Sequence, residues 1–476
     1  MAPGASDEIL PFVSEAPIII YIDFKSPYAY LAIEPTRQML ARLGVIADWR
    51  PFVLDIPSYL GSAKLDKGGK KVAKQNRSQE QWSGVKYAYF DCRRYANLSQ
   101  KTLRGTVKIW NTDGLATAML WLKRIEGLAE QCAEGSLLER YLDAIYEPFW
   151  KREFDAEDES MIAGVLEEIG APTGGFLDYA HGEGAATNAQ LQAAAFGAGV
   201  YGVPTYILTG ETEKDPHNHR FFGRENLPRI EWLLGGRQGP APGAAYPLAP
   251  ETDEAALARC AVDPGSAPEV TETPRRLTTF FDFKSPHCYV ALPALLGLAK
   301  EGIALDWRPF VSRPLNAPAD EAPGEDRGTK HRRIRGEYHV NDLQRYAPHP
   351  LTDLHRETDC RFADMGLLWL QRELGADRDV IDGYVERVFA HLWREGGAID
   401  SARAIEPLLG ATEGLGAGIE AWRAYADGPG HAHLDEARGD AQSRSLAAAP
   451  TFLLGPEPFQ GHAHLPLIRA RLEAGI

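Results

Sequence analysis

The sequence predicts an α/β protein made of two tandem copies of one domain, each a small mixed sheet interrupted by a helical insertion. The main observation is a repeat: the stretch from Tyr21 to Ala32 returns, with changes, from Phe280 to Ala291, and Asp282 follows Asp23 by 259 residues. In each half, short apolar stretches typical of strands also lie on both sides of a long helical region. A chain of 476 residues is long enough for two domains of ordinary size.

Each copy is expected to begin as a β-α-β unit, in which an apolar strand leads through Ser-Pro into a helix. The second strand ends in Trp-Arg-Pro-Phe-Val in both copies. The expected elements are, in order, strands at 18–22 and 277–281, helices at 28–43 and 287–300, and strands at 45–53 and 303–311. Such a unit predicts two parallel strands joined by a right-handed crossover.

The middle of each copy is mostly helical in pattern and carries matching aromatic residues. Strand signals resume at 203–208 and 449–454, and a final amphipathic helix is expected at 227–234 and 465–472. Most tryptophans of the insertions are interpreted as core, and a few as lining an aromatic pocket. The residues concerned are Trp82, Trp110, Trp121, Trp150, Trp369 and Trp393.

A stretch rich in proline and glycine separates the two copies. Residues 235–276 are polar and aperiodic, as expected of a linker, with a short helix predicted at 253–261. The predicted domains are therefore 1–234 and 277–476.

Composition narrows the classes of function. The net charge of −15 argues against a general nucleic-acid-binding protein, because phosphate neutralisation needs surplus Lys and Arg. No apolar run is long enough to span a membrane, and no signal peptide is recognisable at the N-terminus. The five cysteines form neither a CxxC motif nor a metal-ligand spacing, so we expect no metal site and a reducing, cytoplasmic location.

Ser26 and Ser285 are the first candidate site residues. Each follows a strand and precedes a proline that opens a helix, Pro27 in the first copy. Serine is a favoured N-cap and proline suits the first helical turn, so a purely local role is sufficient. A helix N-terminus also stabilises an anion such as a thiolate, and a serine hydroxyl can donate to it. A serine nucleophile of the hydrolase type is not indicated, because the Gly-x-Ser-x-Gly motif is absent.

A proline also stands at the start of a predicted strand in each copy. Val203-Pro204-Thr205 in the first copy matches Ala449-Pro450-Thr451 in the second. An ordinary trans proline fits a strand start. A cis proline, which would present the preceding backbone to a ligand, is the alternative, and the sequence alone leaves both open.

These motifs together resemble the DsbA-like thioredoxin superfamily. The resemblance rests on Asp-Phe-x-Ser-Pro-Tyr-x-Tyr-Leu-Ala, a helical insertion, Gly-Val-Pro-Thr before a strand, and Phe-Gly-Arg before the last helix. Within the superfamily the chain is most similar to 2-hydroxychromene-2-carboxylate isomerases and kappa-class glutathione transferases. The likeness covers both halves nearly end to end and implies two thioredoxin-like domains.

The resemblance also implies roles for individual residues. Ser26 and Ser285 fall where a serine faces the glutathione sulfur in the isomerases, and where the first redox cysteine lies in the oxidoreductases. Pro204 and Pro450 fall on the family's cis proline. The glutathione-binding residues implied in this way are Pro27, Val203, Pro204, Thr205, Arg224, Glu225, Ala449, Pro450 and Thr451.

The sequence departs from the family pattern at the expected γ-glutamyl end. The family places Asp near Glu225, and the second copy has Gly461-His462-Ala463 instead. His287 and Cys288, in the first turn of the second Ser-Pro helix, are further catalytic candidates. His287 is interpreted either as an acid or base or as an exposed residue. Cys288 is interpreted either as a thiol of lowered pKa or as a small buried hydrophobe.

The function implied is glutathione-dependent isomerisation of an aromatic or conjugated small molecule. The alternatives are a kappa-class-like glutathione transferase or thiol oxidoreductase, and a non-catalytic protein that binds glutathione or another ligand. Because related single domains pair as dimers, a tandem chain is expected to be either a monomer with an internal pseudo-dimer or a homodimer.

Overall fold

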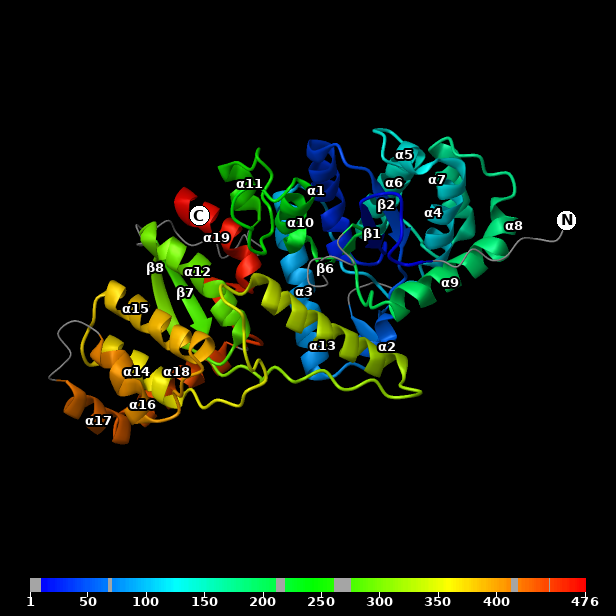
Figure 1. Cartoon of the computed structure of the whole chain (residues 1–476). Coiled ribbons are helices and arrows are strands. Elements are labelled where there is room, and N and C mark those ends of the chain that lie inside the picture. Colours follow the sequence, from blue (N-terminus) through cyan, green and yellow to red (C-terminus); the bar gives the residue numbers. More distant parts are fainter. Residues whose placement is uncertain (1–9, 67–70, 211–218, 261–274, 412–417, 445) are drawn as a thin grey trace. The chain divides into compact units, whose positions relative to one another are not determined.

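The computed structural model describes residues 10–66, 71–210, 219–260, 275–411, 418–444 and 446–476. These residues form two compact units, treated separately below (Figure 1). The first unit comprises 1–252 together with 320–335, and the second comprises 253–319 together with 336–476.

The first unit is built on a mixed four-stranded sheet in the order β2-β1-β5-β6. β1 (Ile18–Ile22) pairs in parallel with β2 (Ala47–Pro51) and antiparallel with β5 (Thr205–Leu208), which pairs with β6 (Arg220–Phe222). All five residues of β1 are buried, which explains its continuous apolar sequence in the middle of the sheet.

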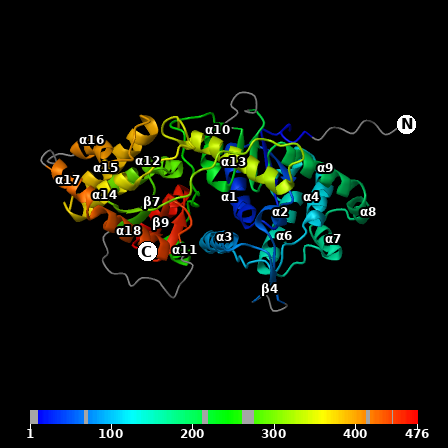
Figure 2. The same cartoon turned by 90° about the horizontal axis from the view of Figure 1, so that it is seen from below.

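Helix α1 (Pro27–Leu43) makes the crossover from β1 to β2. It starts at the Ser26 cap with Pro27 in its first turn, and it ends where Gly44 adopts a left-handed φ of 62°. The other helices of this unit are α2 (Ile56–Leu60), α3 (Gln79–Leu98), α4 (Asp113–Ile125), α5 (Leu128–Gln131), α6 (Leu137–Lys151), α7 (Glu159–Glu168), α8 (Phe176–His181), α9 (Glu183–Gly197), η1 (Arg224–Asn226) and α10 (Leu227–Leu234). Within the insertion α4 packs on α7, α8 and α9 (Figure 2).

The second unit repeats the plan with the sheet order β10-β9-β7-β8. β7 (Arg276–Phe281) pairs in parallel with β8 (Ala304–Pro309) and antiparallel with β9 (Thr451–Leu454), which pairs with β10 (Glu457–Gln460). Its helices are α11 (Glu254–Arg259), α12 (Pro286–Lys300), α14 (Arg361–Arg372), α15 (Arg378–Phe389), η3 (Ala390–Arg394), α16 (Ala402–Gly410), α17 (Ile419–Asp427), α18 (Gly430–Ser443), η4 (His462–His464) and α19 (Leu465–Ala474).

The predicted β-α-β starts, the helical insertions and the returning strands are all confirmed. The short helix expected at 253–261 is α11, while residues 261–274 of the predicted linker lie outside the described residues. Two features were not predicted. The first is a hairpin of β3 (Ala63–Leu65) and β4 (Val72–Gln75) in a region read as mostly helical. The second is the membership of 320–335, including the start of α13 (Arg327–Tyr346), in the first unit.

Candidate functional site

Ser26 and the segment around Pro204, far apart in the sequence, meet at the carboxyl end of β1. The Ser26 Oγ accepts a hydrogen bond from Ala29 N at 3.2 Å and donates to Val203 O at 3.3 Å. The Val203-Pro204 peptide bond is cis. Ser26 is therefore the N-cap of α1 and also contacts the turn that leads into β5. The same buried side chain makes the local capping bond and the contact with the proline turn.

Backbone and side-chain hydrogen bonds tie this turn to the segment before the last helix. Thr205 Oγ1 donates to Gly202 O at 2.7 Å, and Gly223 N donates to Pro204 O at 2.9 Å. The second unit has the same pair of contacts, made by Thr451 and Gly461. In both units the residues after Gly223 or Gly461 are thereby held next to the proline turn.

Asp23, which sequence analysis did not select, anchors the site to its surroundings. Its buried carboxylate accepts from Leu54 N at 2.8 Å and from Thr112 Oγ1 at 2.7 Å, and Lys25 Nζ lies 3.6 Å away. It therefore joins the end of β1 to the start of the helical insertion. The repetition of this residue as Asp282 in the second copy is the sequence signal that could have identified it.

Arg224, at the start of η1, lies over two tyrosine rings that pack edge-to-face against each other, with 5.0 Å between their centroids. Its guanidinium is 4.2 Å from the ring centre of Tyr95 and 4.4 Å from that of Tyr246. The side chain is 5% exposed, and its Nε has no hydrogen-bond partner within the part of the chain that the structure describes. Tyr246 belongs to the stretch predicted as a linker, so sequence reasoning could not place it here. A buried guanidinium with an unused N–H is suited to binding a carboxylate.

The second unit has the same framework with weaker contacts at its serine. Ser285 Oγ lies 3.5 Å from Ala449 O and makes no side-chain cap of α12, and the Ala449-Pro450 bond is also cis. Asp282 accepts from Ser312 N and Oγ at 2.7 Å each. In the second unit a hydroxyl from the loop after β8, that of Ser312, thus donates to the aspartate, as the Thr112 hydroxyl does in the first unit.

The structure bears on the alternative interpretations of His287 and Cys288, in the first turn of the second Ser-Pro helix. Burial raises the pKa of Cys288 to about 12, which contradicts one of its two interpretations, a thiol of lowered pKa. The buried thiol accepts from Asp282 N at 3.5 Å, which fits the interpretation as a small buried hydrophobe. Burial lowers the pKa of His287 to about 4, so its imidazole is neutral at pH 7.

His462 takes the place of Arg224 in the second unit. Its pKa is also lowered to about 4, first by burial and then by the neighbouring His287. Its Nε2 is buried and has no hydrogen-bond partner among the described residues. The His339 ring lies 6.3 Å from that of His287. The second site therefore has the neutral imidazoles of His287 and His462 where the first has a cation.

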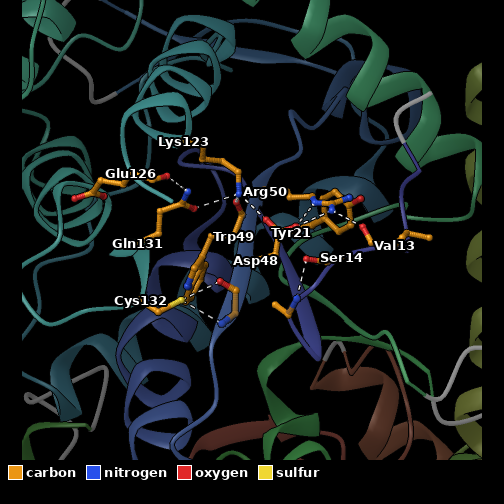
Figure 3. A network of polar contacts seen from close by, with 12 residues as sticks. Val13, Ser14, Tyr21, Asp48, Trp49, Arg50, Lys123, Glu126, Gln131 and Cys132 are labelled. Atoms are coloured by element: carbon orange, nitrogen blue, oxygen red, sulfur yellow. Dashed lines mark hydrogen bonds and ion pairs between the residues drawn. The ribbon is translucent and has the colours of Figure 1, made fainter. Parts of the chain in front are cut away.

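A separate polar network lies around Asp48 on β2 of the first unit (Figure 3). Asp48 pairs with Arg50 at 2.6 Å and with Lys123 at 2.5 Å. Burial would raise the pKa of Asp48, but Lys123 and Arg50 outweigh burial and lower it. Arg50 also donates to the carbonyls of Leu10 and Val13, so this network fastens the segment before β1 to the sheet.

The residues that the structure describes include no group of three or more His, Cys, Asp or Glu side chains that could hold a metal ion. Within the same residues, no helix has the length and apolar character needed to cross a membrane. The five cysteines are all free thiols.

Comparison with known proteins identifies the family. The model of the DSBA-like thioredoxin domain matches residues 17–235 and 276–473. A 2-hydroxychromene-2-carboxylate isomerase from Sphingobium xenophagum is 24% identical over 221 residues, which are 46% of this chain and 97% of that protein.

Two solved structures are also similar. One is a selenomethionine 2-hydroxychromene-2-carboxylate isomerase, with 21% identity, a TM-score of 0.32, and coverage of 42% of this chain and 94% of the other. The second is a probable DsbA oxidoreductase from Streptomyces coelicolor, with 18% identity, a TM-score of 0.33, and coverage of 49% of this chain and 97% of the other. Because the family model matches in two places that together span most of the sequence, the chain belongs to the DsbA-like thioredoxin domain family and carries two copies of the domain.

Proposed function

We propose that the chain is a glutathione-dependent isomerase of the 2-hydroxychromene-2-carboxylate type, acting on an aromatic or conjugated small molecule. The observation that carries the proposal is the position of Ser26. Its hydroxyl lies at the N-terminus of α1 and 3.3 Å from Val203 O, with Ala29 where a CxxC motif would place its second cysteine. The first unit therefore lacks an internal dithiol for disulfide chemistry but keeps a site suited to an external thiolate.

The residues around Ser26 fit glutathione. Arg224 offers a buried, unused Nε–H to a carboxylate of the tripeptide, and Glu225 follows it in the chain. The backbone of Val203, next to Pro204 and Thr205, would pair with the cysteinyl part. When bound, glutathione would supply a thiolate that adds reversibly to a conjugated carbon.

The roles of the protein groups are electrostatic and positional. The Ser26 hydroxyl, if it turned from Val203 O toward the sulfur, and the N–H groups of the first turn of α1 would lower the pKa of a thiol placed there. Pro27 contributes no N–H in that turn, so the donors come from the residues after it. No protein side chain needs to form a covalent bond in this scheme, because bound glutathione would supply the nucleophile.

A non-catalytic binding role is the second candidate, and it applies to the second unit. Neutral His462 and Ala463 replace Arg224 and Glu225, so this unit has fewer charges for a zwitterionic γ-glutamyl group. Thiol exchange through Cys288 is less favoured, because burial raises its pKa to about 12. Ser285, with Pro450 and Thr451 beside it, remains the group to test there.

The proposal is tested by calorimetric titration with glutathione and by following isomerisation of 2-hydroxychromene-2-carboxylate by absorbance, with and without glutathione. The expected result is binding by the wild-type protein and loss of most turnover in Ser26→Ala. Ser285→Ala measures the share of the second unit. Ser160→Ala, at an exposed serine of α7, is the matched control and should behave as wild type. Absence of glutathione binding by the wild type would overturn the proposal.

We also propose that the tandem chain is a monomer, in which the two copies take the place of a dimer of single domains. Light scattering coupled to size-exclusion chromatography should give the mass of one chain, about 52.4 kDa. Twice that mass would favour the homodimer.

A further inference from the structure

A segment encoded in the second copy forms part of the first unit. Residues 320–335 follow β8 of the second sheet in the sequence, but they cluster with 1–252. Figures 1 and 2 both place the beginning of α13 beside α2. The first unit is thus completed by residues that lie after the whole of its own repeat.

Close contacts show that this segment is tightly seated. A Cβ at Gly328 would lie 2.5 Å from Ser58 O, so only glycine allows this approach of α13 to α2. Arg327 pairs with Asp55 at 3.1 Å, and its guanidinium lies 4.1 Å from the ring centre of Phe196.

His331 makes the contact that reaches the site. Its ring is stacked on Tyr59, with 3.8 Å between centroids and 4° between planes, and it meets the Tyr201 ring edge-on at 5.6 Å. Its Nε2 lies 3.1 Å from Tyr201 O. Because a carbonyl only accepts hydrogen bonds, Nε2 must carry the proton and donate. The side chain is 6% exposed, so the hydrogen bond is shielded from water.

Tyr201 lies two residues before Val203, in the turn that faces Ser26. The next residue, Gly202, accepts from Thr205 Oγ1 at 2.7 Å, and a Cβ at Gly202 would lie 2.6 Å from the Phe222 ring. The turn is therefore fixed by side chains of its own copy, Thr205 and Phe222, and at Tyr201 O by His331 from the second copy.

We infer that His331, supplied by the second copy, is a positioning residue for the first site: by holding Tyr201 O, it fixes the backbone of Val203 against Ser26. His331 acts on the site of the proposed function, so the identity of the ligand in this inference rests on that proposal. His331 touches neither Ser26 nor Val203, so its effect passes through the Tyr201–Val203 backbone.

Two substitutions in the full-length protein separate the hydrogen bond from the stacking. His331→Phe keeps a ring against Tyr59 and removes the donor, whereas His331→Gln keeps an N–H donor and removes the ring. We expect His331→Phe to weaken glutathione binding about fivefold, the effect of one lost hydrogen bond. His331→Gln should stay within about twofold of wild type. His181→Ala, at an exposed histidine of α8, is the control.

Calorimetry gives the dissociation constants, and hydrogen exchange read by mass spectrometry follows the backbone around 201–208 without any ligand. Faster exchange confined to that turn in His331→Phe, with wild-type exchange in His331→Gln, supports the inference. This result would hold even if the wild-type protein did not bind glutathione, because failure to bind would overturn only the proposed function. Unchanged exchange in His331→Phe, or an equal increase throughout the first unit, would overturn the positioning role. So would equal loss of affinity in the two variants.

Discussion

The two serines should differ in what they contribute to stability, and Ser26→Ala is the sharper of the two perturbations. In the first unit the substitution removes an N-cap bond to Ala29 N at 3.2 Å and a buried bond to Val203 O at 3.3 Å. A lost N-cap costs about 1 kcal/mol. A lost buried hydrogen bond costs about 1 kcal/mol more. The expected fall in the free energy of unfolding is about 2 kcal/mol, or about 4–8 °C in Tm for a unit of this size.

Ser285→Ala provides the internal comparison. Ser285 makes no side-chain cap, and its contact with Ala449 O is 3.5 Å long, so we expect a loss below about 1 kcal/mol. Pulse proteolysis in urea, read by mass spectrometry, reports each unit through its own peptides. Equal losses for the two variants, or a larger loss for Ser285→Ala, would refute the reasoning.

Three further predictions concern charge and burial. Arg224→Ala should weaken glutathione binding at least tenfold by calorimetry. Arg224→Lys should not restore it, because an ammonium has neither the planar guanidinium that lies over the Tyr95 and Tyr246 rings nor its Nε–H; affinity equal to wild type in Arg224→Ala would exclude the carboxylate role. Cys288→Ala should keep turnover within about twofold of wild type. Iodoacetamide at pH 8 should label Cys132 before Cys288 in mass spectra, since Cys288 is buried with a pKa of about 12 and Cys132 is partly exposed. Early labelling of Cys288 would contradict its burial. Burial, and next the charge of Asp282, raise the pKa of Asp364 to about 8. The folded state therefore holds a proton that the unfolded chain releases above about pH 4, so the stability that this group contributes falls as the pH rises from about 4 to about 8. Asp364→Asn should flatten the dependence of Tm on pH across that window, and an unchanged slope would argue against the raised pKa.

Local patterns were sufficient for the framework of the fold. Continuous burial of β1 follows from its apolar sequence, and Ser-Pro at a helix start predicted α1 and α12 to within one residue. The repeat made each prediction twice, which is why the returning strands and last helices were also placed correctly. These features depend on short-range chemistry that a sequence displays directly.

The parts that could not be predicted depend on contacts between distant residues. The contact of Arg224 with the rings of Tyr95 and Tyr246 joins three segments, one of which has the composition of a linker. The raised pKa of Cys288 follows from the packing around α12, and its sequence position alone could not decide between a reactive thiol and a small buried residue. The β3–β4 hairpin is short and mostly exposed, so it has little apolar alternation to reveal it.

The placement of 320–335 in the first unit also affects the order of events during synthesis. The ribosome finishes residue 252 first, but the first unit is complete only after residue 335, 83 residues later. At the usual rate of about 5–20 residues per second, that delay is about 4–17 s. During this interval, the nascent chain holds Tyr59 and Tyr201 without the imidazole that later lies between them, and the second sheet is still being made. Completion of the first unit is therefore coupled to synthesis of the second copy, although the first unit holds the N-terminal half of the chain.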